Sequence, residues 1–439
     1  MKKIYIDTLG CAKNEYDSQM LAASLLERGC CIVYDPLEAD ILIVNTCGFI
    51  EDAKKESIER IFELADQKGR DMKLVVTGCL SERYHNELAE EMPEVDMFFG
   101  VNDYDNLPGI LMDESNDPGV RDQVGTKLDD LAYHAREFDE GAYYGYLKIA
   151  EGCNNACSFC AIPSIRGPFR SKRIEDCVRE AEDMADAGIR ELILIAQDTS
   201  QYGRDLYGKI MLPELLHQLC RIEGIDWIRL MYVYDNGITD ELIDTIANEP
   251  KICKYIDMPI QHIADPVLHR MRRQSTGSSI KAAIEKLRAR IPDVHIRTTL
   301  LVGFPGETEQ DIDCLLDFID TMKLDRVGAF AFSDEEGTPS FELDGKLDEE
   351  TKQARRNLVM EHQLKVSEAL NELKIGRTYE VIVDEIVDEG VFSGRTRYDS
   401  PEIDCEVTFS SGNDLVPGDI VNVRITNAYE YDLEGEEVK

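Results

Sequence analysis

The sequence lacks the long hydrophobic runs and the nucleotide-binding motifs that mark several large protein classes. In its 439 residues no apolar stretch approaches the roughly 20 residues that a membrane span needs, so export and membrane insertion are not expected. No G-x-G-x-x-G or Walker sequence is present, which argues against dehydrogenase and kinase chemistry. The seven histidines form no H-E-x-x-H or Cys-His pairing and so give no support for a zinc or general-base role.

Positive charge is also scarce. Lys and Arg together number 48 against 87 Asp and Glu, which gives a formal net charge of −39. A field of this sign repels phosphate backbones and attracts basic partners. A nucleic-acid substrate is therefore disfavoured before any motif is considered.

Cysteine, in contrast, is plentiful. Thirteen cysteines in a large acidic chain without a signal-peptide pattern indicate a reducing compartment, and we expect a cytoplasmic protein. In such a compartment clustered cysteines are metal ligands more often than disulfide partners, and the odd count weakens a disulfide framework further.

The patterning predicts three domains of an α/β protein. Residues 1–125 alternate β-branched runs with amphipathic helices, which indicates an N-terminal parallel sheet. Residues 140–370 contain six strand candidates, most of them followed by a helix, which indicates a (β/α)6 partial TIM barrel. Residues 371–439 hold short strands with Gly and Asp turns, typical of a small antiparallel β-barrel. The polar, turn-rich stretch 102–141 is interpreted as a linker over its surface-exposed part.

The strongest chemical signal is the segment EGCNNACSFC, which follows the first strand of the second domain. We call Cys153, Cys157 and Cys160 the barrel cysteines. Three thiolates in one loop fit a 4Fe-4S cube and leave one iron free to bind the amine and carboxylate of a small molecule. The alternatives are a zinc site, which would want a fourth Cys or His nearby, and simple buried thiols.

A second group of cysteines lies in the first domain. Cys11, Cys47 and Cys79, the N-terminal cysteines, each follow a strand directly, in IDTLGC, VNTCG and VVTGC. Because the carboxyl ends of parallel strands lie along one edge, we expect these thiols to converge, with the neighbouring glycines allowing tight turns. The functional interpretation is a second 4Fe-4S cluster with an open iron. The alternative is three small buried side chains.

Together these features resemble the radical S-adenosylmethionine (SAM) methylthiotransferase family, over essentially the whole chain, with a C-terminal barrel of the TRAM type. The resemblance implies that the cluster on the barrel cysteines delivers an electron to SAM. The products would be methionine and a 5′-deoxyadenosyl radical, which removes hydrogen from an unactivated carbon. The cluster on the N-terminal cysteines would hold or supply the sulfur, a second SAM would donate the methyl group, and a flavodoxin or ferredoxin would supply electrons.

Within that family, local sequence favours one substrate branch. The segments LGCAKNEYDSQ and IPSIRGPFRSKR, and the acidic pair Glu335 and Glu336, resemble the RimO-type branch. That branch modifies the β-carbon of an aspartate in ribosomal protein S twelve. Residues 371–439 carry six Lys and Arg against 17 Asp and Glu, unlike an RNA-binding barrel. The alternatives are methylthiolation of transfer-RNA adenosine and, in another class, a non-catalytic iron-sulfur electron-transfer or scaffold protein.

Less specific sequence signals suggest further residues of the site. By resemblance, Phe159 and Gln197, with Asp198 beside it, would contact SAM, and the alternative is that they have ordinary packing or capping roles. Gly303 and Glu307 stand in the loop after the fifth barrel strand, where function is common, and this loop would let the backbone approach SAM, although an ordinary capped turn gives the same pattern.

A short basic stretch follows the barrel cysteines in this otherwise acidic chain, and it includes Arg166, Arg170, Lys172 and Arg173. We expect Arg166 or Arg170 to pair with the carboxylate of the substrate aspartate, since arginine binds carboxylates in a bidentate manner. The alternative is that these arginines form salt bridges within the protein.

Overall fold

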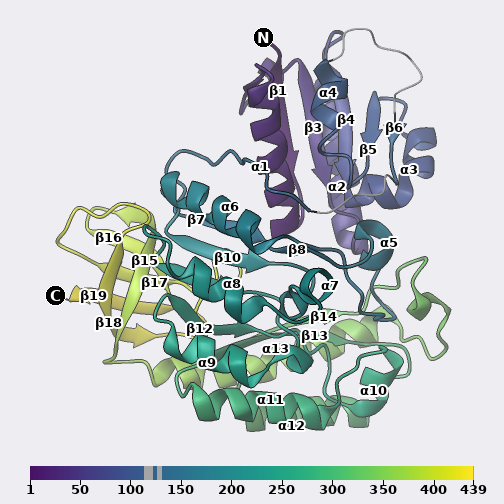
Figure 1. The fold of residues 1–439 in the computed structure, drawn as a ribbon. Coiled ribbons are helices and arrows are strands. Elements are labelled where there is room, and N and C mark those ends of the chain that lie inside the picture. Colours follow the sequence, from purple (N-terminus) through teal and green to yellow (C-terminus); the bar gives the residue numbers. More distant parts are fainter. Residues whose placement is uncertain (113–121, 126–130, 439) are drawn as a thin grey trace.

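The computed structural model describes residues 1–112, 122–125 and 131–438, and their strands form three main sheets that follow one another along the chain. Figure 1 shows the N-terminal sheet at the top, the larger partial barrel beneath it and the C-terminal barrel at the side. The remaining positions of the expected linker lie outside the described residues.

The N-terminal sheet is entirely parallel, in the order β2-β1-β3-β4-β5-β6. Its strands are β1 (Lys3–Thr8), β2 (Cys31–Ile32), β3 (Ile41–Thr46), β4 (Lys73–Gly78), β5 (Met97–Phe99) and β6 (Asp122–Gln123). Its helices are α1 (Ala12–Glu27), the short η1 (Pro36–Glu38), α2 (Glu51–Gln67), α3 (Cys79–Glu91) and α4 (Leu107–Met112).

Both faces of this sheet are covered by helices, which explains why its strands are continuous apolar runs. On β3, Ile41 and Ile43 pack with α1 and α4 on one face, and Leu42 and Val44 pack with α2 and α3 on the other. Within the stretch 102–141, α4 packs into this core and β6 pairs with β5, so these two elements belong to the N-terminal domain and not to a linker. Both elements are too short to show a clear periodicity.

The second sheet confirms the predicted partial barrel. Its six strands are all parallel, in the order β14-β13-β12-β11-β10-β7. They are β7 (Tyr144–Lys148), β10 (Glu191–Ile195), β11 (Trp227–Leu230), β12 (Ile252–Asp257), β13 (His295–Val302) and β14 (Arg326–Ala331). The short strands β8 (Ala150–Glu151) and β9 (Arg170–Ser171) form a separate antiparallel pair after β7.

Most helices of this domain cover the outer face of the barrel, where Leu192 and Leu194 of β10 pack against them. The helices are α5 (Ile162–Arg166), α6 (Ile174–Asp186), α7 (Arg204–Tyr207), α8 (Leu212–Leu219), α9 (Asp240–Asn248), α10 (Asp265–Arg270), α11 (Gly277–Arg290), α12 (Glu309–Met322) and α13 (Glu349–Glu372). Helix α5 instead packs against the N-terminal domain. Three short turns complete the set: η2 (Thr199–Gln201), η3 (Asp235–Gly237) and η4 (Pro339–Glu342).

The C-terminal strands close into a five-stranded barrel in the order β15-β16-β17-β19-β18. They are β15 (Thr378–Asp388), β16 (Val391–Thr396), β17 (Val407–Ser410), β18 (Ile420–Ala428) and β19 (Leu433–Val438). The expectation of a wholly antiparallel barrel is wrong at one seam, since β17 and β19 are parallel. An odd number of strands cannot alternate in direction around a closed ring, so one such pair is required.

Buried charge joins the C-terminal barrel to the partial barrel. The carboxylate of Glu191, on β10, accepts hydrogen bonds from Arg229 at 2.7 Å and from Arg395 of β16. In a second pair between these two domains, Arg326 of β14 donates to Asp399 at 2.6 Å. Ion pairs this deeply buried fix one geometry because each partner left alone would be costly. The C-terminal barrel is therefore held to the partial barrel by specific charges.

Among the described residues, no helix combines the length and the apolar character required to cross a bilayer.

We expect Glu191→Gln to lower the free energy of unfolding by about 3–5 kcal/mol, because Arg229 and Arg395 would remain buried without a full counter-charge. Urea unfolding at neutral pH measures this effect. The matched control is Glu436→Gln, which breaks the exposed pair with Arg424 and should change stability by at most about 1 kcal/mol. Equal effects of the two substitutions would contradict this account.

Helix α1 contacts β7, and Glu15 on it lies near Glu402 of the C-terminal barrel. Burial, and then Glu402, raise the pKa of Glu15 from 4.5 to about 7. The folded state therefore favours the protonated form of Glu15. The stability that this form contributes is fully present below pH 4.5 and is lost as the pH rises through 7. Glu15→Gln should therefore match the parent in urea unfolding at low pH and exceed it above neutral pH. An equal loss at both ends of the range would show that Glu15 acts through packing instead.

Candidate functional site

The structure brings the three N-terminal cysteines together at the carboxyl ends of β1, β3 and β4, which are adjacent strands. Cys11 is exposed and caps α1, Cys47 is buried after β3, and Cys79 is the buried first residue of α3. Burial raises the pKa of the Cys79 thiol to about 12, and the neighbouring thiols of Cys11 and Cys47 act in the same direction.

Glycines allow these three loops to interlock. A Cβ on Gly10 would lie 2.7 Å from the Cβ of Cys47, and one on Gly48 would lie 2.6 Å from the Cα of Leu80. Gly78 has a φ of +98°, and a Cβ there would lie 2.4 Å from the carbonyl oxygen of Thr46. The close approach of the cysteine loops therefore depends on glycine at these three positions, where any Cβ would overlap a neighbouring loop.

The barrel cysteines lie in one loop between β8 and α5. The backbone N–H of Cys153 donates to the carbonyl of Gly167 at 3.1 Å, and Arg273 Nη1 lies 3.7 Å from the sulfur of Cys157. Burial raises the pKa of the Cys160 thiol to about 12, with Cys157 and Cys153 adding to the effect. In the described part of the chain no three His, Cys, Asp or Glu residues are grouped to hold a single metal ion.

A cavity of about 870 Å³ is lined by residues that stand close in sequence to a cysteine of each group. Phe49 and Ile50 line it from the loop after Cys47, and Phe159 lines it from the position before Cys160. Its remaining wall includes Gln261, Thr299, Leu301, Phe330, Phe332, Glu335 and Arg356. The same space is thus accessible from the loops that carry the two cysteine sites.

The side chains expected to contact SAM differ in their surroundings. Phe159 lines the cavity, and Gln197 donates to Glu151 at 2.9 Å, with its own buried amide oxygen left without a partner in the described structure. Glu307 is buried, and its carboxylate accepts from the Gly303 N–H at 2.9 Å and from Arg355 at 2.8 Å. Because these protein donors occupy Glu307, its surroundings favour the capped-turn alternative for this loop.

Asp198, next to Gln197, is also buried. Its carboxylate accepts from the Asn155 side chain at 2.9 Å and from Ser200 Oγ at 2.5 Å. Burial raises the pKa of Asp198. Asp198 therefore ties the loop of the barrel cysteines to the end of β10.

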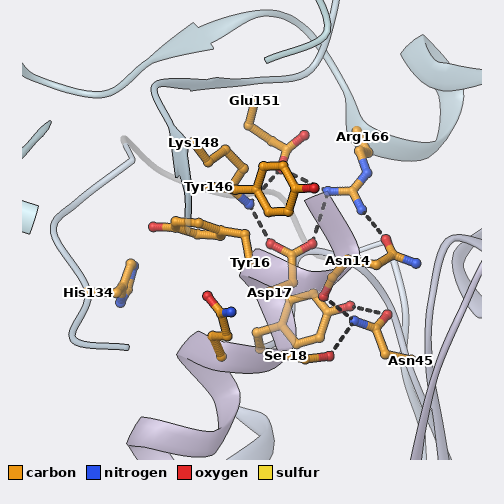
Figure 2. A network of polar contacts seen from close by, with 12 residues as sticks. Asn14, Tyr16, Asp17, Ser18, Asn45, His134, Tyr146, Lys148, Glu151 and Arg166 are labelled. Atoms are coloured by element: carbon orange, nitrogen blue, oxygen red, sulfur yellow. Dashed lines mark hydrogen bonds and ion pairs between the residues drawn. The ribbon is translucent and has the colours of Figure 1, made fainter. Parts of the chain in front are cut away.

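Arg166 lies inside the protein, on α5, and reaches from the partial barrel into the N-terminal domain. Its guanidinium donates to Asp17 at 3.1 Å, to Glu151 at 2.9 Å and to the side-chain oxygen of Asn14 at 2.7 Å (Figure 2). These partners leave no support for the expected pairing of Arg166 with a substrate carboxylate. Arg170 is half-buried in β9, opposite Glu151.

Several residues of this junction were missed by the sequence analysis. Lys148 donates to Asp17 at 2.5 Å and to Glu151 at 2.8 Å, which completes a buried set of two cations and two carboxylates. Figure 2 shows Asp17 between Lys148 and Arg166. Asn14 and Asp17 stand three and six residues after Cys11, so helical spacing in LGCAKNEYDSQ was the available signal.

Further contacts join the N-terminal domain to the partial barrel. The ammonium of Lys13 lies 3.4 Å from the ring centroid of Tyr232, at the end of β11. Glu335, at the rim of the cavity, accepts from Lys54 at 2.8 Å and from Arg83 at 2.9 Å. Glu335, one of the two acidic residues by which the sequence resembles the RimO-type branch, therefore also holds the two domains together.

Comparison with known proteins agrees with this architecture. Residues 3–100 match the model of the uncharacterized protein family UPF0004, residues 147–319 match the radical SAM superfamily, and residues 375–438 match the TRAM domain. Among solved structures, the radical SAM methyltransferase TsrM from Kitasatospora setae is similar with a TM-score of 0.59. The match has 15% sequence identity and covers 77% of this chain and 76% of TsrM, so it shows the fold alone.

Curated relatives are similar over nearly the full length. The ribosomal protein uS12 methylthiotransferase RimO of Clostridioides difficile is 45% identical, with 99% of each chain covered. The protein of the same name from Desulforamulus reducens is 46% identical, again with 99% of each chain covered. That from Geobacter sulfurreducens is 46% identical and covers 99% of this chain and 98% of the relative.

We expect Gly78→Ala to destabilise the N-terminal domain and to reduce the iron that the chain binds on anaerobic reconstitution, because the new Cβ would overlap Thr46. Gly29→Ala is the matched control, since Gly29 also has a positive φ, of +80°, but a Cβ there meets nothing within 4 Å. The control should cost only about 1–2 kcal/mol of backbone strain and keep its iron. Equal iron content in the two variants would contradict the interlocking of the cysteine loops.

Proposed function

The chain belongs to the RimO family of radical SAM methylthiotransferases, and we propose that it adds a methylthio group to the β-carbon of an aspartate in ribosomal protein uS12. The observation that carries this proposal is the cavity lined both by the loop after Cys47 and by Phe159, next to Cys160. Sulfur insertion at an unactivated carbon needs a radical source and a sulfur donor at one substrate atom. A shared cavity meets that requirement.

The cysteine sites fit two 4Fe-4S clusters. Each site offers three thiols, and each has an arginine near a sulfur, Arg166 beside Cys79 and Arg273 beside Cys157. Cationic N–H donors stabilise the thiolates that iron binding requires. When bound, the cluster on the barrel cysteines and SAM supply the radical, and the cluster on the N-terminal cysteines supplies sulfur. We propose a flavodoxin or ferredoxin as electron donor, in the cytoplasm.

The chain's own residues then position the substrates and exclude water. Phe159 supplies an apolar wall of the cavity, and the amide oxygen of Gln197 offers a free acceptor to an amine such as that of SAM. The buried pairs around Asp17 and Glu335 hold the two domains together. Close contact between the domains limits the access of solvent, which protects a radical from side reactions.

The C-terminal barrel supports a basic protein as the substrate. Two of its six basic residues are turned toward the partial barrel, because Arg395 binds Glu191 and Arg397 donates to the carbonyl of Pro250. The hairpin between β15 and β16, in contrast, exposes acidic side chains at Glu385, Asp388 and Glu389. Such a surface attracts a basic ribosomal protein and repels RNA.

Replacing the barrel cysteines with alanine, or the N-terminal cysteines in a second variant, should each remove about four of about eight iron atoms per chain. Iron and sulfide assays after anaerobic reconstitution measure this loss. Replacement of Cys177 and Cys220 in helical segments is the control and should leave iron unchanged. A variant that loses all iron, or none, would contradict two independent clusters.

The substrate is tested by mass spectrometry of ribosomal proteins and transfer-RNA digests from cells with and without this chain. We expect a methylthio increment of about 46 Da to be lost from uS12 alone. Loss from transfer RNA would instead identify the adenosine enzyme and overturn the charge argument. If neither changes in an iron-loaded chain, the alternative of a non-catalytic iron-sulfur protein is favoured.

A further inference from the structure

We propose that Arg166 is a positioning residue of the N-terminal cluster, whose N–H···S hydrogen bond to Cys79 raises the reduction potential of that cluster. The inference rests on the proposed function, because it requires the N-terminal cysteines to hold iron. It also assigns to Arg166 a role different from the substrate contact expected at first.

The geometry is direct. Arg166 Nη2 lies 3.5 Å from the sulfur of Cys79, and the same nitrogen donates to Asn14 at 2.7 Å. The other terminal nitrogen, Nη1, is held by Asp17 and Glu151. The guanidinium is only 2% exposed, so it is fixed by four neighbours and shielded from water. Its N–H groups therefore point at the sulfur without any rearrangement.

The charges around Arg166 determine how its hydrogen bond to Cys79 affects the thiolate. Lys148, Arg166, Asp17 and Glu151 are all buried, and their formal charges cancel. A thiolate at Cys79 adds negative charge to this closed set. The Arg166 guanidinium is in contact with the sulfur and offers it a cationic N–H donor. It therefore stabilises the ionised, iron-binding form.

Reduction of an iron-sulfur cluster adds a further electron to the same sulfurs. Hydrogen bonds to cluster sulfurs and nearby positive charge stabilise the reduced state and raise the potential. Arg166 stands six residues after Cys160, on the helix that follows the barrel cysteines. One side chain thus ties the loop of one cluster to a ligand of the other.

The test uses the full chain with the barrel cysteines replaced by alanine, so that only the N-terminal cluster titrates. In this background Arg166→Lys keeps the charge but cannot reach Asn14, Asp17 and Cys79 together. We expect its midpoint potential, from an EPR-monitored redox titration, to be more negative than that of the unsubstituted background.

Arg136→Lys is the matched control. The Arg136 side chain is buried in the same junction, 2.9 Å from Glu180, and among the described residues no hydrogen bond or ion pair joins it to a cysteine. Its variant should keep the potential of the background. An unchanged potential in Arg166→Lys, or an equal fall in both variants, would overturn the inference. A background chain that binds no iron would overturn the proposed N-terminal cluster itself, which is a distinguishable failure.

A second measurement needs no substitution at Arg166. Arginine labelled with nitrogen-15 in the guanidinium should give a nitrogen-15 hyperfine coupling to the reduced cluster in the same background. The coupling should persist in Arg136→Lys. Its absence from an iron-loaded chain would contradict a hydrogen bond from Arg166 to the cluster.

Discussion

The arrangement of the two cysteine sites depends on one buried interaction, the carboxylate of Asp17 between Lys148 and Arg166. Asp17 belongs to the N-terminal domain, and both cations belong to the partial barrel. Burial alone would raise the pKa of the fourth member, Glu151, but Arg166 and Lys148 hold that pKa well below its ordinary value. The four charges are satisfied only when the two domains meet in this one orientation.

Other contacts reinforce the same orientation from different sides. Tyr16 and Lys172 meet Glu180 behind the Asp17 junction, and Lys54 and Arg83 meet Glu335 across the cavity. Between them the loops of both cysteine sites open into one space. The chemistry proposed for the chain therefore follows from how the domains are joined, since neither domain alone encloses the cavity.

The sequence predicted the fold and the positions of the cysteine sites because both follow from local pattern. Strand periodicity located the six barrel strands. Because Cys11, Cys47 and Cys79 each follow a strand directly, the sequence also predicted that they meet at one edge of the N-terminal sheet. The junction was not predictable in the same way, because Asp17 and Arg166 are 149 residues apart and each resembles an ordinary surface charge. Arg166 was accordingly assigned to substrate, and the parallel seam between β17 and β19 was missed because only barrel closure requires it.

Residues next to a cysteine of each group line one cavity in the assembled chain, so two clusters bound at these sites should lie close together. The EPR spectrum of the fully reconstituted, reduced protein, compared with the spectra of the two variants that each retain a single cluster, tests this directly. A shared cavity predicts magnetic coupling, so that the spectrum of the parent is broader than the sum of the two. A parent spectrum equal to that sum would place the clusters too far apart to act on one substrate atom and would contradict the account.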